Sequence, residues 1–142
     1  MKRASAFLVA MGLLAGCLEQ QSDPVFSVPN GASAMQAREG FKKAVIVAEL
    51  IAVNCGGQGI ARNYSSLDNV TNASWDGLVA HGYSVEELQK ASLQDKRQDA
   101  GSSALQYLEQ RGAIIGQPKS VCPIGKSEID KQTAVGKLLK RV

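Results

Sequence analysis

The longest apolar pattern in the chain lies in residues 33–54. Apolar side chains recur there every three or four residues, as they do on the buried face of a helix, and the stretch AVIVAELIAV is apolar almost all round. This pattern predicts a central, buried helix from Ser33 to Asn54. The glycine-rich stretch GGQG that follows Cys55 is expected to end it, because glycine has low helix propensity and readily adopts left-handed caps.

Two further helices are expected from weaker patterns. One is predicted over residues 60–81, with the glycine that follows as its C-terminal cap. Ser84 and Glu87 then have the spacing of a capping box, in which each side chain hydrogen-bonds the backbone N–H of the other residue. A third helix therefore begins there. We interpret the polar stretch QDKRQDAGSS as an interruption near Gly101 in one helix that ends at Gly112.

The last predicted helix spans residues 120–139, and Pro123 lies in its first turn, where a proline is tolerated. Aromatic residues make up 5% of the chain, which favours an aliphatic helical core. Four helices joined by short connections predict an all-α fold, an up-down four-helix bundle. Residues 34–142 are expected to form this single domain.

The first sixteen residues have the layout of a secretory signal peptide. Lys2 and Arg3 supply a positive start. Ala4 to Leu14 form an apolar core that is too short to span a bilayer, since a membrane-spanning helix needs about 20 apolar residues. We therefore expect residues 1–16 to be a targeting segment.

The stretch Leu14-Ala15-Gly16-Cys17 resembles a bacterial lipobox. The small residues let the extended chain enter a peptidase, and the thiol accepts a diacylglycerol before cleavage between Gly16 and Cys17. Several acyl chains on one residue would hold the protein firmly on a membrane. Because Leu18 follows instead of an aspartate, the resemblance implies a periplasm-facing outer-membrane lipoprotein of the bacterial cell envelope. The alternative is an ordinary cleavable signal and a soluble periplasmic protein.

The segment after the lipobox has the composition of a tether. Residues 17–33 contain Pro24 and Pro29 and show little periodicity, so we interpret them as a lipidated cysteine followed by a flexible linker. About 15 extended residues reach roughly 50 Å. A lipid-anchored domain could therefore stand clear of the bilayer.

The net charge argues against a nucleic-acid partner. The whole chain has 16 basic and 13 acidic residues, but loss of Lys2 and Arg3 with the leader would leave 14 basic residues against 13 acidic ones, a net charge of +1. No basic surplus then remains to displace the counterions of a phosphate backbone. We interpret the basic residues near the C-terminus as the solvated face of the last helix, with docking to an anionic surface as the alternative. These residues are Lys126, Lys131, Lys137, Lys140 and Arg141.

Cys55 and Cys122 are left as a pair if Cys17 carries the lipid. In an oxidising compartment two such cysteines are expected to form a disulfide. Cys55 follows the first predicted helix and Cys122 lies at the start of the last, and these two ends lie together in an up-down bundle. A metal pair or a reactive thiol is the alternative. Because His81 is the single histidine, a tetrahedral zinc site would lack ligands, and we expect no metal and no cofactor.

Few residues suggest chemistry. Glu49 lies inside the apolar first helix, and Arg62 follows the glycine-rich stretch. A partly buried carboxylate with a raised pKa would mark a site, but we interpret Glu49 as solvent-facing or paired with an arginine. His81, in the last turn of its predicted helix, is expected to interact favourably with the helix dipole. No catalytic residue is predicted, because no nucleophile, base or paired carboxylates are placed together by the sequence.

Short motifs spread over residues 45–139 give a further likeness. They are Ala48-Glu49-Leu50, Cys55, Ile60, Arg62, Gly82-Tyr83-Ser84, Glu86-Glu87, Tyr107, Gly112, Ser120-Val121-Cys122, Gly125, Glu128-Ile129 and Gly136-Lys137-Leu138-Leu139. In this order they resemble a domain-of-unknown-function (DUF) family of short exported alphaproteobacterial proteins. The resemblance implies export, a helical fold, the disulfide and a structural pairing of Glu49 with Arg62, and it implies no activity. Members tend to have an ordinary cleavable signal, so the lipobox is a departure.

These observations predict a non-catalytic envelope lipoprotein that binds or supports a protein partner at the membrane surface. The alternative is a small-ligand carrier or enzyme that uses an inter-helix pocket near Glu49 and Arg62. A pocket lined by these two residues and Tyr64 would favour the alternative.

Overall fold

The structure, a computed structural model, describes residues 28–94 and 100–142. The described residues are mainly helical, with six α-helices and a two-stranded sheet. The predicted leader, Cys17 and most of the predicted tether lie outside the described residues. No helix within the described ranges is both long enough and apolar enough to cross a membrane. The elements are α1 (Ala34–Cys55), β1 (Ile60–Arg62), α2 (Leu67–His81), α3 (Val85–Gln94), α4 (Ala100–Glu109), α5 (Cys122–Asp130), α6 (Ala134–Lys137) and β2 (Leu139–Arg141), with 3-10 turns at Gly56–Gln58 and Pro118–Val121.

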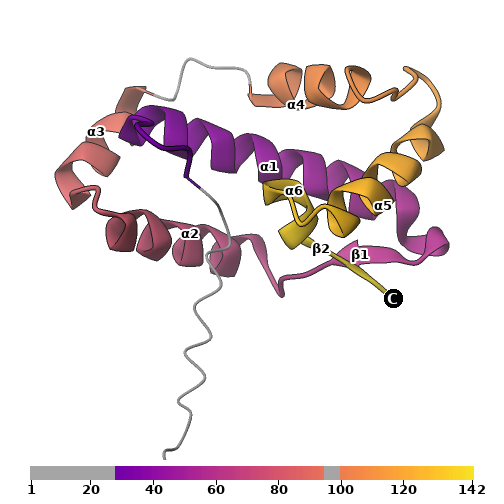
Figure 1. The fold of residues 1–142 in the computed structure, drawn as a ribbon, viewed down its shortest axis with the longest axis horizontal. Coiled ribbons are helices and arrows are strands. Elements are labelled where there is room, and N and C mark those ends of the chain that lie inside the picture. The colour runs from indigo at the N-terminus through magenta and orange to yellow at the C-terminus, as the bar shows by residue number, and fades with distance from the viewer. Residues whose placement is uncertain (1–27, 95–99) are drawn as a thin grey trace, which may run out of the picture.

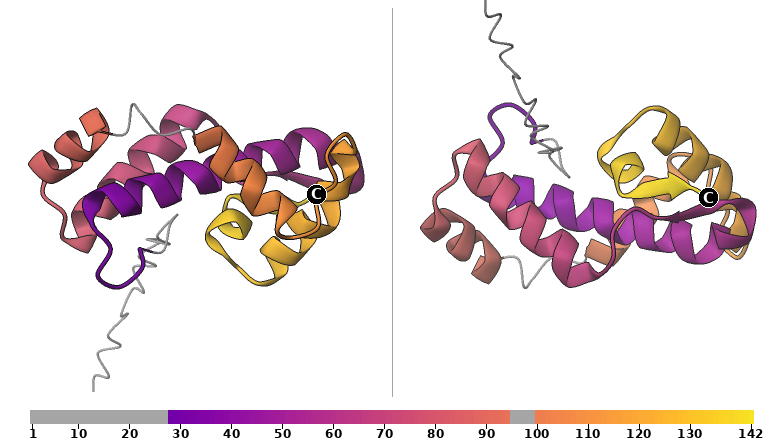
Figure 2. Two further views of the ribbon diagram at one scale, coloured as in Figure 1. Left: turned by 90° about the horizontal axis from the view of Figure 1, so that it is seen from above. Right: turned by 90° about the horizontal axis from the view of Figure 1, so that it is seen from below.

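The helix α1 is the axis of the molecule, as the pattern over residues 33–54 predicted. Ser33 caps it, because the Ser33 hydroxyl accepts a hydrogen bond from the Gln36 backbone N–H and the Gln36 side chain accepts one from the Ser33 N–H. One end of α1 contacts α2 and α3, and the other contacts α4, α5 and α6 (Figures 1 and 2).

Two apolar clusters result from this arrangement. Around the first half of α1, the smaller cluster is built on Ala37, Leu78 and Leu88. Around the second half, the larger cluster includes Ile51 and Ile60, both completely buried. The molecule is therefore a long central helix with one group of elements packed on each half, α2 and α3 on the first and α4, α5 and α6 on the second.

The helix predicted over residues 60–81 begins later than expected. Gly59 has a φ of +77°, which reverses the chain after α1, and residues 60–62 form β1 instead of a first helical turn. β1 pairs antiparallel with β2, with Ile60 opposite Arg141. The helix α2 then starts after Ser66, whose side chain caps it by accepting a hydrogen bond from the Asn69 N–H at 3.2 Å.

The region predicted as one last helix over residues 120–139 consists of four pieces. After the 3-10 turn come α5, α6 and β2. The break after α5 has local causes: Gln132 adopts a left-handed φ of +49°, and the Thr133 side chain caps α6 by accepting from the Gly136 N–H at 3.0 Å. Pro123 lies in the first turn of α5, as expected. Because of this break and of β1, an up-down four-helix bundle is not confirmed.

The capping box at the start of α3 is present. The Ser84 N–H donates to the Glu87 carboxylate at 2.8 Å, and the Glu87 N–H donates to the Ser84 hydroxyl at 3.2 Å. The single interrupted helix predicted from there to Gly112 is instead described as α3 and α4, which pack on opposite halves of α1 (Figure 1). Gly101, the expected break, lies in the first turn of α4, and α4 ends at Glu109.

Cys55 and Cys122 form the predicted disulfide. It joins the last residue of α1 to the first residue of α5, and both cysteines are completely buried in the larger apolar cluster. Although the bundle is not confirmed, the two helix ends that the sequence placed together do meet. The disulfide thereby fixes the start of the C-terminal segment, which contains α5, α6 and β2, to the central helix.

Candidate functional site

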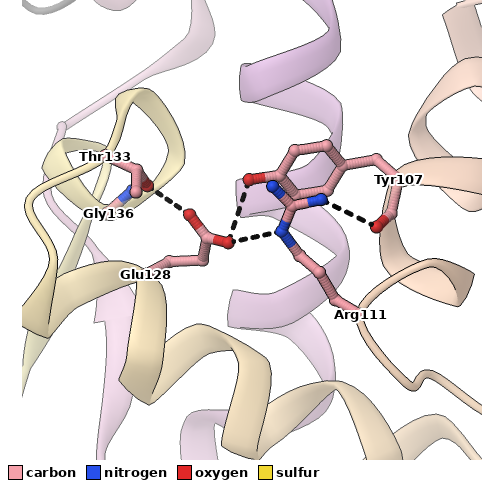
Figure 3. Close-up of polar contacts among 5 residues, drawn as sticks. All are labelled: Tyr107, Arg111, Glu128, Thr133 and Gly136. Carbon is pink, nitrogen blue, oxygen red and sulfur yellow. Dashed lines mark hydrogen bonds and ion pairs between the residues drawn. The ribbon is translucent and has the colours of Figure 1, made fainter.

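The most buried polar centre of the described residues is built around Glu128 (Figure 3). This α5 side chain is 5% exposed. The Tyr107 hydroxyl of α4 donates to Glu128 Oε1 at 2.9 Å, and Arg111 Nε donates to the same oxygen at 3.0 Å. The Thr133 hydroxyl donates to Oε2. Both carboxylate oxygens therefore have donors from within the chain.

The Glu128 cluster connects three segments that are separate in the sequence. Arg111 lies flat on Tyr107, with its Cζ 3.5 Å from the ring centre, so the guanidinium is held by the carboxylate and by the aromatic face together. Thr133 links α5 to α6, because its hydroxyl donates to Glu128 while accepting from Gly136. A Cβ atom on Gly136 would lie 1.9 Å from the Glu128 carbonyl oxygen, so this close approach requires glycine.

The electrostatics of the cluster keep Tyr107 protonated. Burial, followed by the hydrogen bond to Glu128 and the charge of that carboxylate, raises the pKa of Tyr107 to about 12. Tyr107 is therefore a hydrogen-bond donor at neutral pH. A carboxylate that accepts hydrogen bonds on both oxygens from these donors is suited to holding α4, α5 and α6 together.

Local patterns in the sequence give Glu128 no role. It lies in the polar stretch KSEIDKQT, where a glutamate is expected to face solvent. The sequence did contain one signal for this region. Thr133 and Gly136 are three residues apart, the spacing at which a threonine side chain caps the start of a helix. That signal marks a chain reversal, and only the reversal places α6 against the carboxylate.

Glu49 and Arg62 lie together, as one interpretation of the sequence had them. Arg62 Nη2 is 2.6 Å from Glu49 Oε2, and the Tyr64 hydroxyl donates to Oε1. Burial alone would raise the pKa of Glu49, but the hydrogen bonds from Arg62 and Tyr64 and the charge of Arg62 together lower it below its ordinary value. The pKa of Glu49 is therefore lowered, and not raised as a buried site carboxylate would require.

Tyr64 belongs to the same group as Glu49 and Arg62, and its hydroxyl donates a hydrogen bond to Glu49. Burial, then the hydrogen bond and the charge of Glu49, raise its pKa well above the ordinary value. The three side chains join α1 to the last residue of β1 and to the segment that follows it. Like the Glu128 cluster, this group joins elements of the fold.

The remaining predicted residues are dispersed. His81 ends α2, with its ring centre 5.7 Å from that of Tyr83. The basic residues 126–141 do not share one helix face, because α5, α6 and β2 replace the single helix. Arg141 is paired with Asp130 at 2.7 Å. Within residues 28–94 and 100–142, no group of three or more His, Cys, Asp or Glu side chains is placed to hold a metal.

Two cavities are lined by residues other than those of the two polar clusters. The larger, about 530 Å³, lies between the first half of α1, α2 and the end of α3. The smaller, about 320 Å³, lies between α1, α4 and the turn that follows α4. Neither is lined by Glu49, Arg62 or Tyr64. Sequence reasoning missed both, since each is formed by side chains from segments far apart in the chain.

A group of exposed apolar side chains borders the smaller cavity. Leu105 of α4 is 55% exposed, and Ile114 and Ile115 in the following turn are 54% and 84% exposed. We call these three residues the apolar ledge. The sequence signal for it was two consecutive isoleucines in a short connection where a polar loop is the norm.

The match with known proteins covers nearly all of the described chain. Residues 35–140, from the start of α1 to β2, match the family of unknown function DUF5333. The chain belongs to the DUF5333 family. Both polar clusters, both cavities and the disulfide lie within the part that matches the family. Neither a curated protein nor a solved structure matches the chain.

Proposed function

We propose that this DUF5333 chain is a non-catalytic lipoprotein of the bacterial envelope, whose domain holds a protein partner at the membrane surface. In this proposal residues 1–16 are removed, Cys17 carries the lipid, and residues 17–33 tether the domain of residues 34–142 to the outer membrane. The lipobox residues Leu14 to Cys17 support the anchor. The disulfide supports an oxidising compartment.

The apolar ledge is the observation that carries the binding role. Its turn is well fixed: the Ala113 N–H donates to the Leu108 carbonyl at 3.0 Å, and the Ile114 N–H donates to the Ser120 hydroxyl at 2.9 Å. A fixed turn that exposes two isoleucines leaves apolar area in water that a partner would cover. The adjoining cavity offers a partner's apolar side chain a place to enter.

The two polar clusters support a role without catalysis. Glu128 and Glu49 each accept hydrogen bonds on both carboxylate oxygens from donors within the protein. A general base must lie within reach of a substrate proton, and neither glutamate lines either of the two cavities described above. In the proposed function these carboxylates maintain the shape that presents the ledge.

The binding role is tested by quantitative affinity capture from detergent-solubilised membranes. Ile115→Ser should deplete a reproducible partner at least about tenfold relative to wild type, because burial of one large aliphatic side chain contributes about 1.5–3 kcal/mol. Leu93→Ser is the matched control, since Leu93 is 69% exposed on α3 and lies outside the ledge. Equal capture by the wild type and both variants would contradict the proposal.

Sedimentation of the purified protein distinguishes a partner protein from a second copy. We expect Ile115→Ser to leave the oligomeric state unchanged. If the variant instead abolishes self-association seen in the wild type, the ledge joins two copies and the accessory role is wrong.

The anchor is tested separately by fractionating cells that express Cys17→Ser. The variant is expected to leave the membrane fraction for the soluble periplasmic fraction, because the acyl chains are lost. Membrane association that persists in the variant at the wild-type level would contradict the lipid anchor.

The alternative function was a ligand carrier or enzyme with a pocket near Glu49 and Arg62. Both residues lie in an ion pair and border neither of the two cavities described above. No observation favours a site at these two residues. The larger cavity, on the first half of α1, offers a different possibility.

A further inference from the structure

The larger cavity has mostly apolar walls. α1 contributes Phe41, Val45 and Ile46, and α2 contributes Trp75 and Leu78. Its volume of about 530 Å³ is within the range of small-molecule sites, roughly 300–1,000 Å³. Such walls suit the apolar body of a ligand.

Arg38 and Lys42 are the two cationic side chains in the lining of this cavity, and the contacts of Arg38 are well defined. Its guanidinium lies over the Trp75 ring, with Cζ 5.4 Å from the centroid, and its Nη2 donates to the Ser92 hydroxyl at 3.2 Å. These contacts hold it between α1, α2 and α3. Fixing a long arginine side chain in advance lowers the entropy that a ligand must offset on binding.

The hydrogen bonding of Arg38 is incomplete. Its Nε is buried and has no hydrogen-bond partner. Among the described residues, no carboxylate forms a salt bridge with Arg38. Buried donors are normally satisfied, so this N–H is an exception. A guanidinium that lines a mainly apolar cavity, is held by Trp75 and Ser92 and has an unsatisfied N–H is suited to recognising an anion.

We propose that this cavity binds a fatty carboxylate of medium chain length, with the carboxylate at Arg38 and the aliphatic chain against Phe41, Val45 and Leu78. The planar guanidinium offers several parallel N–H donors to the two carboxylate oxygens. The apolar walls exclude a small hydrophilic anion, which would lose its hydration without compensation. This site is independent of the apolar ledge and of the lipid anchor.

Tryptophan fluorescence can follow binding at this site, because Trp75 is the single tryptophan of the chain and lies in the cavity wall. Full-length protein carrying Cys17→Ser is titrated with decanoate below its micellar concentration while the Trp75 emission is followed. We expect a saturable change. Decanol, which has the same chain without the charge, should bind at least about tenfold more weakly.

Variants separate the contribution of the charge from that of the cavity. Arg38→Met should weaken decanoate binding by about 10- to 100-fold, the loss of a charge-assisted hydrogen bond, and should leave decanol unchanged. Arg141→Met is the control, because Arg141 lies in an exposed ion pair outside the cavity. Val45→Phe keeps Arg38 but narrows the cavity, and it should weaken decanoate and decanol alike. Far-UV circular dichroism checks that each variant is folded.

Three results would overturn the proposal. The first is a wild type without a saturable response, and the second is equal affinity for decanoate and decanol. The third is an Arg38→Met protein that binds decanoate as Arg141→Met does. Vesicles of anionic phospholipid distinguish a free fatty acid from a bilayer surface: a response to vesicles but not to monomeric decanoate would mean surface binding, and the site would be wrong.

Discussion

Replacement of Glu128 by alanine tests whether the Glu128 cluster holds the C-terminal elements together. The change removes a carboxylate that is 5% exposed and leaves the Arg111 charge and the Tyr107 and Thr133 hydroxyls without their acceptor. Removing one partner of a buried pair costs about 3–5 kcal/mol. Because Arg111 is 41% exposed, water can solvate its guanidinium in part. We therefore expect a loss near the lower end, about 3 kcal/mol of unfolding free energy.

The assay is urea denaturation of the full-length protein with its disulfide intact, followed by far-UV circular dichroism. Asp130→Ala is the control on the same helix, since Asp130 and Arg141 form an exposed pair, and a loss below about 1 kcal/mol is expected there. A cycle with Arg111→Met should show a coupling of about 0.5–3 kcal/mol to Glu128→Ala. If Glu128→Ala lowers the unfolding free energy no more than Asp130→Ala does, the structural role of the Glu128 cluster is refuted.

Three further predictions follow from the same structure. Gly136→Ala should destabilise the protein by about 1–3 kcal/mol or more, because its Cβ would meet a backbone carbonyl at 1.9 Å. Gly77→Ala, in α2 with open space around it, should stabilise the protein by about 0.5–1 kcal/mol. Urea denaturation measures the change in unfolding free energy for both variants. A change of the same sign in both would contradict the packing described for the two glycines. Replacing Cys55 and Cys122 by serine should lower the unfolding free energy by up to about 4 kcal/mol, since the disulfide closes a sequence separation of 67 residues, and an unchanged urea midpoint would contradict this. The pKa of Tyr107 is raised to about 12, so its stabilising contribution is complete below the unfolded pKa of about 10 and is lost as the pH rises through about 12. Tyr107→Phe should flatten the decline of stability over that range, and an unaltered slope would count against the buried phenol.

The elements with strong local signals could be predicted from the sequence. The apolar periodicity and the glycine-rich stretch placed α1 to within one residue of each end. The capping box at Ser84 placed the start of α3. The disulfide was predicted because two cysteines remained once Cys17 was interpreted as the lipidation site, and because both were expected at neighbouring helix ends. For the two helix starts, one short stretch of sequence contains the whole physical cause, whereas the disulfide needed a count of cysteines and an expected layout of helix ends.

The elements that depend on distant partners could not be predicted. β1 has three residues, too few to show an alternating pattern. Its partner β2 is adjacent in space but lies at the C-terminal end of the sequence. Ile60 therefore resembled the start of a helix, although its burial comes from the sheet and the α1 contacts. The ion pair of Glu49 and Arg62 was anticipated through the family resemblance, whereas the Arg38 cavity needs three helices in place before it exists.

Intact-mass spectrometry of the protein extracted from cell membranes, under non-reducing conditions, tests the central claim most directly. We predict a chain that begins at Cys17, carries the mass of its acyl groups, and lacks the two thiol hydrogens of Cys55 and Cys122. A chain that begins at Met1, carries no acyl group and retains both thiols would contradict the account.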